Sequence, residues 1–127
     1  RVYGPAFMRH ALENSPRSVK HYLLGGSEAA GRELARRFPG ANIVGAHHGR
    51  CSADGALEEN DRVVAEINGL SPDFLWVGLG APKQERWIER NKSRLARGVV
   101  LSVGQAFDVN AGLRADAPSW MQRAGLT

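Results

Sequence analysis

Four short apolar runs, each nearly continuous and separated from the next by an amphipathic segment, constrain the fold of this chain more than any other feature. They occupy residues 21–24, 42–46, 73–79 and 98–103. Runs that are apolar throughout, rather than at alternate positions, are typical of strands buried on both faces, as in a parallel sheet. Strands that alternate with helices predict a single-domain α/β, Rossmann-like fold with a mainly parallel sheet and flanking helices.

The segments between these runs carry helix signals. Residues 5–14 predict a leading helix, and Ser27 can N-cap a second one that ends at Pro39-Gly40. The next helix is expected to stop at Asn68-Gly69, and Pro82 suits the first turn of the last. The residues at helical spacing are Ala30, Leu34 and Phe38, then Leu57, Val64 and Ile67, then Trp87, Ile88, Asn91 and Leu95.

Composition limits the class of protein. A length of 127 residues with 43% apolar content suits one folded domain. No apolar run is long enough for a transmembrane helix, and no apolar region follows Arg1 as in a signal peptide. The single cysteine, Cys51, favours a reducing, cytoplasmic setting. The net charge of +4 fits either an ordinary basic surface or affinity for anions such as nucleotides, and no nucleic-acid recognition motif accompanies it.

Glycine and polar residues follow each predicted strand. Because ligands of such folds bind at the carboxyl ends of the strands, these four segments predict one binding crevice. Glycine allows backbone amides to approach a phosphate, and a following helix N-terminus favours negative charge. The segments are Gly25-Gly26-Ser27, His47-His48-Gly49, Gly80-Ala81-Pro82-Lys83-Gln84-Glu85, and Gly104-Gln105-Ala106-Phe107-Asp108.

Several better-known sites are disfavoured. The segment 25–31 has neither the G-x-G-x-x-G spacing of a dinucleotide site nor the P-loop pattern, which argues against a nicotinamide-dependent dehydrogenase. His47, His48 and Cys51 lack a second cluster of ligands, so no metal site is expected. Trp76 and Trp87 fit the core better than a stacking platform.

Two carboxylates, Asp108 and Glu85, each have a functional and a purely structural interpretation. Asp108 follows a strand, where it can bind a ribose or sugar hydroxyl or simply cap the next turn. Gln84 and Glu85 lie in a first helical turn that should face the crevice, although Glu85 there also favours the helix dipole.

Several stretches together resemble the WecG/TagA/CpsF family of bacterial glycosyltransferases, in order along essentially the whole chain. The most specific are the Gly-Ala-Pro-Lys-Gln-Glu segment at 80–85 and the Ala-Pro-Ser-Trp-Met-Gln segment at 117–122. His47-His48-Gly49 and Val103–Asp108 also fit.

The resemblance implies inverting, metal-independent transfer, without a cofactor, of N-acetylmannosamine or a related hexose. The donor would be a UDP-sugar and the acceptor a polyprenyl diphosphate-linked sugar, in teichoic acid or other surface polysaccharide synthesis. Such an enzyme works at the cytoplasmic face of the membrane. Gln84 matches the active-site motif and Asp108 the family's Phe-Asp pair. The expected substrate-binding residues are Gly25, Gly26, His48, Gly80, Lys83, Gln84, Glu85, Gly104, Phe107 and Asp108.

The resemblance also implies that residues 1–127 form a partial domain. The family's general base is an aspartate upstream of the segment that corresponds to Arg1, and a basic appendage for membrane contact follows the segment that ends here at Thr127. The chain alone is therefore expected to be inactive as a transferase. A non-catalytic module that binds nucleotide sugars is the alternative. The sequence leaves the formation of a homo-oligomer open.

Overall fold

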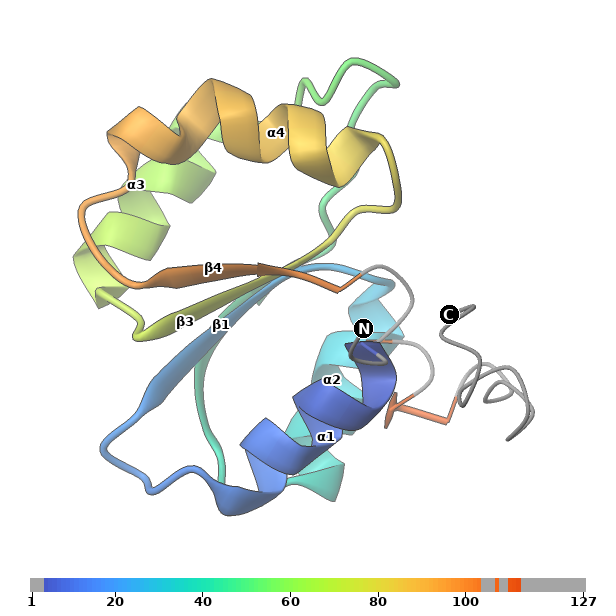
Figure 1. The fold of residues 1–127 in the computed structure, drawn as a ribbon, viewed down its shortest axis with the longest axis vertical. Helices are drawn as coiled ribbons and strands as arrows, with labels where there is room; N and C mark the ends of the chain where they lie inside the picture. The colour runs from blue at the N-terminus through green and yellow to red at the C-terminus, as the bar shows by residue number, and fades with distance from the viewer. Residues whose placement is uncertain (1–3, 104–106, 108–109, 113–127) are drawn as a thin grey trace.

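A computed structural model describes residues 4–103, 107 and 110–112 of the chain (Figure 1). Strands and helices alternate along most of it, as the sequence predicts. The elements are α1 (Gly4–Asn14), β1 (Lys20–Gly25), α2 (Glu28–Arg37), β2 (Asn42–His47), α3 (Asn60–Leu70), β3 (Phe74–Gly78), α4 (Lys83–Asn91), the 3₁₀ turn η1 (Lys92–Arg94) and β4 (Val99–Ser102).

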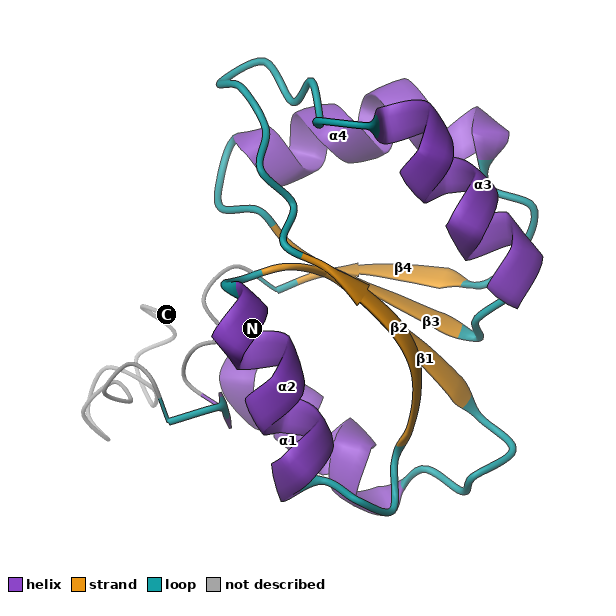
Figure 2. Ribbon diagram, turned by 180° about the vertical axis from the view of Figure 1, so that it is seen from behind, coloured by secondary structure: helices purple, strands orange, loops and turns teal. Residues whose placement is uncertain are grey.

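The four strands form one parallel sheet with the order β2-β1-β3-β4. Helices α1 and α2 cover one face, and α3 and α4 cover the other (Figures 1 and 2). Helix N-termini and strand carboxyl ends therefore meet at one edge of the sheet. This arrangement confirms the predicted α/β, Rossmann-like fold with flanking helices. Among the described residues, no helix is long and apolar enough to cross a bilayer.

The central strands β1 and β3 are buried on both faces, which explains why they are apolar at consecutive positions. The residues of the edge strands β2 and β4 are half-buried or exposed, so the prediction of strands buried on both faces is confirmed for β1 and β3 only. In β1, Leu23 joins the core on the α1–α2 side, whereas Tyr22 and Leu24 join the core on the α3–α4 side. Trp76 and Trp87 are fully buried, one in each core, so their prediction as core residues is confirmed.

Two helix boundaries differ from the prediction. Helix α3 begins at Asn60, after Leu57, and it continues through Asn68-Gly69 to Leu70. The helix tolerates Asn68 because its side chain binds outside the helix: Nδ2 donates to the carbonyl oxygen of Arg94 (2.8 Å) and Oδ1 accepts from the amide of Ala96 (2.8 Å). Helix α4 ends before Leu95, which follows η1. The N-cap at Ser27 is confirmed, since its Oγ accepts from the amide of Ala30.

A buried histidine lies in the middle of the sheet. The indole N–H of Trp76 donates to Nδ1 of His21 (3.0 Å), and the His21 ring stacks on Phe74 with centroids 5.5 Å apart. This hydrogen bond requires a neutral imidazole with an unprotonated Nδ1. Burial lowers the pKa of His21, and the opposing attraction of Asp73 is weaker.

Acidification is therefore expected to destabilise the protein through His21. The pKa of His21 is lower in the folded state than its ordinary value near 6.5. The contribution of the neutral ring to the free energy of unfolding is therefore complete above pH 6.5 and is lost as the pH falls below it. Urea unfolding at pH 7.5 and 5.5 should show the decrease, and His21→Phe, which keeps an aromatic ring but cannot titrate, should show a smaller one. Equal decreases in both proteins would contradict this role.

Candidate functional site

The segments that follow β1, β2 and β3 meet at the carboxyl edge of the sheet, where the sequence predicts a crevice. Gly49 and Gly25 are in such close contact that a Cβ on Gly49 would lie 2.8 Å from the Cα of Gly25. A Cβ on Gly26 would lie 3.0 Å from Cδ2 of Phe107, beyond β4. Gly25, Gly26 and Gly49 all have positive φ, which favours glycine. The loops thus pack closely: Gly49 lies against the backbone of Gly25, and Gly26 lies against the side chain of Phe107.

Two helix N-termini point toward this edge. Helix α2 starts after the Ser27 cap, and α4 starts at Lys83, with the amide of Gln84 donating to the carbonyl of Gly80 (2.9 Å). N-terminal amides and the helix dipole favour a negatively charged group. Lys83 adds a positive charge in the first turn of α4, where its side chain is half-buried. The edge therefore suits an anion such as a diphosphate.

Gln84 is buried, with an exposed fraction of 7%, whereas its neighbour Glu85 is exposed. Its Nε2 lies 3.4 Å from Oε1 of Glu85. This burial rules out a purely solvent-facing position for Gln84 and places it inside the first turn of α4. Whether its amide contacts substrate stays a prediction.

The two adjacent histidines at the end of β2 are held in defined orientations. Nδ1 of His47 accepts from the amide of Gly49, and Nδ1 of His48 accepts from the amide of Arg50, each at 3.0 Å. The neutral form of each ring therefore carries its proton on Nε2. Burial, followed by the nearby His48 and Arg62, lowers the pKa of His47. In the described part of the chain, no three His, Cys, Asp or Glu side chains are placed to hold a metal ion.

A groove of about 400 Å³ lies between α2 and the edge strand β2. One end of the groove reaches the loops that contain Ser27 and His48, at the carboxyl edge of the sheet, and the rest follows β2. Gly31 of α2 faces β2 here, since a Cβ at this position would make an ordinary van der Waals contact with Cβ of Ala46, at 3.4 Å. The lining residues are Gly25, Ser27, Gly31, Arg32, Ala35, Ile43, Val44, Gly45, Ala46, His47 and His48.

The groove includes residues that the sequence analysis missed. Arg32 is the cation of its lining, and Gly31 and Ala35 are small residues four positions apart on α2. A small-residue pair at this spacing, one turn after a helix cap, is a signal that the sequence contained. It could not reveal that α2 packs beside an edge strand, because strand order is a tertiary property.

The predicted site residues are distributed unevenly. Gly25 and His48 line the groove, and Gly26 lies beside it against Phe107. Gly80, Lys83, Gln84 and Glu85 lie at the start of α4. Phe107 is buried in the core on the α1–α2 side, so it supports the loop after β1 from below. Gly104 and Asp108 lie outside the described residues.

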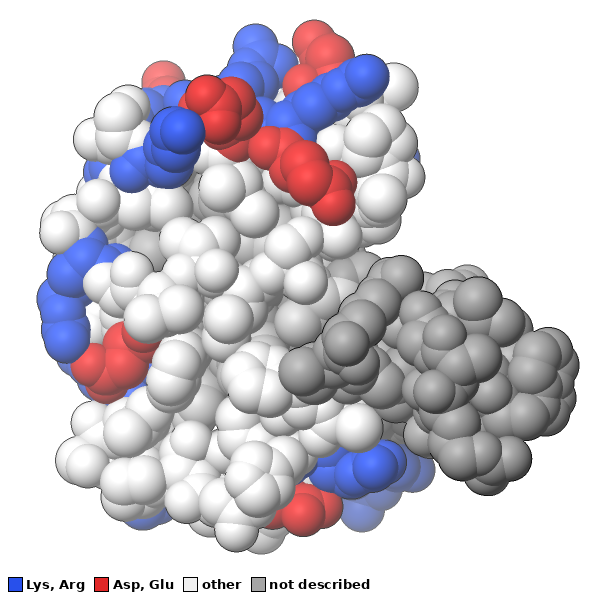
Figure 3. Space-filling model, viewed as in Figure 1, with Lys and Arg blue, Asp and Glu red and all other residues white. Residues whose placement is uncertain are grey.

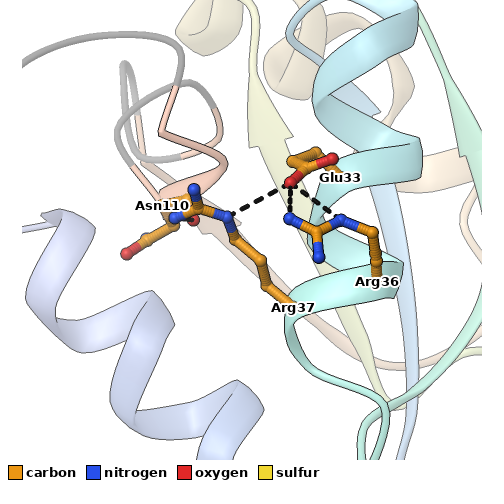
Figure 4. Close-up of polar contacts among 4 residues, drawn as sticks. All are labelled: Glu33, Arg36, Arg37 and Asn110. Atoms are coloured by element: carbon orange, nitrogen blue, oxygen red, sulfur yellow. Dashed lines mark hydrogen bonds and ion pairs between the residues drawn. The ribbon is translucent and has the colours of Figure 1, made fainter.

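Asn110, which follows β4 in the sequence, is hydrogen-bonded to both helices on one face of the sheet, α1 and α2. Its side chain Nδ2 donates to the carbonyl of Pro5 in α1 (2.8 Å). Its own carbonyl accepts from Nη1 of Arg37 in α2 (3.4 Å), and Glu33 holds the guanidinium groups of Arg36 and Arg37 (Figure 4). The amide of the next residue, Ala111, donates to the carbonyl of Phe107 (2.9 Å), which links these contacts to the buried Phe107.

Asn110→Ala is expected to lower the free energy of unfolding by about 1 kcal/mol, because it removes a buried hydrogen bond and leaves space behind. The matched control is Asn14→Ala, which removes the same kind of bond, from Nδ2 to a carbonyl of α1, at an exposed position. Chemical denaturation should show a smaller loss for the control. Equal losses would contradict a role for Asn110 in attaching this segment.

Comparison with known proteins shows the family of this chain. The model of the glycosyl transferase WecG/TagA/CpsF family matches residues 1–127. The chain belongs to this family. Two N-acetylglucosaminyldiphosphoundecaprenol N-acetyl-beta-D-mannosaminyltransferases, from Staphylococcus aureus strains NCTC 8325 / PS 47 and MRSA252, are each 36% identical to it. Each comparison covers 83% of this chain and 44% of the relative. The chain thus spans less than half the length of these WecG/TagA/CpsF relatives, and the resemblance seen in its motifs is confirmed.

Proposed function

We propose that this chain forms the donor-binding part of a glycosyltransferase. The enzyme moves N-acetylmannosamine or a related hexose from a UDP-sugar to a polyprenyl diphosphate-linked sugar. Family membership and the names of the staphylococcal relatives support the transferred sugar and the acceptor. A UDP donor and inversion at the anomeric carbon are proposed from the resemblance to the family.

The observation that carries this proposal is the convergence of glycine loops and two helix N-termini at one edge of the sheet. A nucleotide diphosphate needs close backbone amides and positive charge, and this edge provides both near Gly26 and Lys83. During transfer, the diphosphate leaves with additional negative charge, which the helix N-termini and Lys83 stabilise.

The remaining chemistry requires a base. An acceptor hydroxyl attacks the anomeric carbon, and a general base takes its proton. We place this base in the polypeptide upstream of Arg1, in agreement with the resemblance. Gln84 orients the donor sugar or a phosphate oxygen through its amide, and Asp108 binds a hydroxyl of the ribose or the sugar. Membrane contact, through a basic segment that follows Thr127, would bring the site to its lipid-linked acceptor at the inner membrane face.

Calorimetric titration tests the donor class directly. We expect UDP-N-acetylmannosamine and UDP to bind the protein, and NAD to show no binding, because the segment 25–31 lacks the dinucleotide pattern. Lys83→Ala should weaken binding of UDP, whereas Lys92→Ala, on an exposed lysine beyond the end of α4, should not. Tight binding of NAD with none of UDP would exclude this function. Binding without sugar transfer by the longer protein would favour the non-catalytic module.

A further inference from the structure

Strand β4 leaves one edge of the sheet unpaired among the described residues. The amide of Val99 donates to the carbonyl of Asp73, the residue before β3 (2.9 Å). The amide of Val103 donates to the carbonyl of Val77 in β3 (3.0 Å). Alternate residues of a strand point their backbone groups in opposite directions along the sheet. The N–H and C=O groups of Val100 and Ser102 therefore point outward from the edge.

The surface around this edge is apolar. Val99 is 52% exposed and Phe7 of α1 is 40% exposed, which makes them the large exposed hydrophobic side chains of the described chain. Figure 3 shows a broad face without charged side chains across the level of β4, with lysine, arginine and acidic groups gathered around its rim. Free edge strands are normally protected by charges, proline or a very short length. Strand β4 is short, with four residues, but its sequence, Val-Val-Leu-Ser, has neither a charge nor a proline. This edge therefore has the character of a strand that is covered.

The topology of the sheet indicates what covers it. The connection from β1 to β2 runs through α2, on the same face of the sheet as α1 (Figure 2). Crossovers between parallel strands are right-handed, so every crossover on this face must move in the same direction, from the β4 side toward the β2 side. A strand that leads through α1 into β1 must then start on the β4 side. Since β3 and β4 already occupy the nearest positions, the first free position is beyond β4.

The start of α1 lies where such a connection would arrive. Gly4 is beside the carboxyl end of β4, since a Cβ on Gly4 would be 3.3 Å from the carbonyl oxygen of Val103. The staphylococcal relatives are more than twice as long as the part that this chain covers. Their extra length is sufficient for further strands.

We propose that the β4 edge binds a parallel strand from the same polypeptide, upstream of Gly4, which extends the sheet order to β2-β1-β3-β4 and this additional strand. The proposal concerns the sheet and does not depend on the proposed function. Its consequence for function is positional. The carboxyl end of the added strand lies at the same edge as the loops of Gly25 and Gly80, so residues that follow it can add side chains to that site.

Amide hydrogen exchange tests the proposal residue by residue, in residues 1–127 and in a longer gene product that includes the upstream polypeptide. We expect the amides of Val100 and Ser102 to exchange roughly 100-fold more slowly in the longer protein. The amide of Val99, which already donates to the carbonyl of Asp73 just before β3, is the internal control for folding and should be protected in both proteins. If the shorter chain does not fold, the exchange rates of the Val100 and Ser102 amides in the longer protein test the proposal by themselves, and slow exchange is the expected result.

Fast exchange of Val100 and Ser102 in the longer protein would overturn the proposal. Protection that appears in residues 1–127 and increases with protein concentration would also overturn it, because the occupant would then be a second copy. Val99→Lys provides a second measurement: it should lower the melting temperature of the longer protein by roughly 5 °C or more. Ala65→Lys, at an exposed position of α3, is the control and should leave the melting temperature unchanged.

Discussion

Gly25→Ala is expected to destabilise the protein by about 3 kcal/mol or more. Gly25 has φ of 123°, a region that L-residues with a Cβ rarely adopt, and an added Cβ would overlap the carbonyl oxygen of Gly78 in the neighbouring strand β3. Neither group can move without breaking the end of the β1–β3 ladder, where these two residues are paired. Urea denaturation should show a lower midpoint with an unchanged dependence on urea.

Gly69→Ala is the matched control for this prediction. Gly69 lies within α3, and a Cβ there would meet no atom within 4 Å. Alanine is the better helix former, so this variant should be more stable by about 0.5–1 kcal/mol. The expected changes in stability have opposite signs for the two glycines because their backbone conformations and surroundings differ. Similar stabilities of the two variants would mean that the loop after β1 can relax and does not fix the shape of the carboxyl edge.

Replacing Gln84 is expected to reduce sugar transfer by roughly 3- to 150-fold in the longer, active protein. This range corresponds to the loss of one hydrogen bond in the transition state, worth about 0.5–1.5 kcal/mol to a neutral oxygen and about 1.5–3 kcal/mol to a charged one. Gln84 lies in the first turn of α4 beside the loop of Gly80, and its amide can donate to a phosphate or sugar oxygen. Steady-state rates of Gln84→Ala measure the effect.

The burial of Gln84 makes a stability control necessary. Gln84→Met keeps most of the buried volume but removes the amide, so it separates packing from a role in the site. We expect its thermal melt to remain near that of the wild type, while its rate falls as far as that of the alanine variant. Glu89→Ala, on a 74% exposed side chain of the same helix, should change neither quantity. An unchanged rate in Gln84→Met would remove Gln84 from the active site.

Residues near the ends of the strands show how far pattern reasoning extends into the site. Ser27 was identifiable as a helix cap because its hydroxyl acts on an amide three residues away, which is a local interaction. The groove beside it was not identifiable, because it depends on α2 packing next to β2, and Arg32 looked like any exposed arginine. His21 likewise had no visible partner in the sequence, since Trp76 is 55 residues away.

The sequence by itself determined that this chain forms a parallel α/β fold of the WecG/TagA/CpsF family. Continuous apolar runs are typical of strands buried on both faces, as β1 and β3 are, and the motif at residues 80–85 is specific. Only the tertiary structure decided the strand order, the burial of Gln84 and the contacts of Gly25 with Gly49 and of Gly26 with Phe107. The physical reason is that hydrophobic periodicity records how deeply a segment is buried, but it carries no information about which distant segment lies beside it.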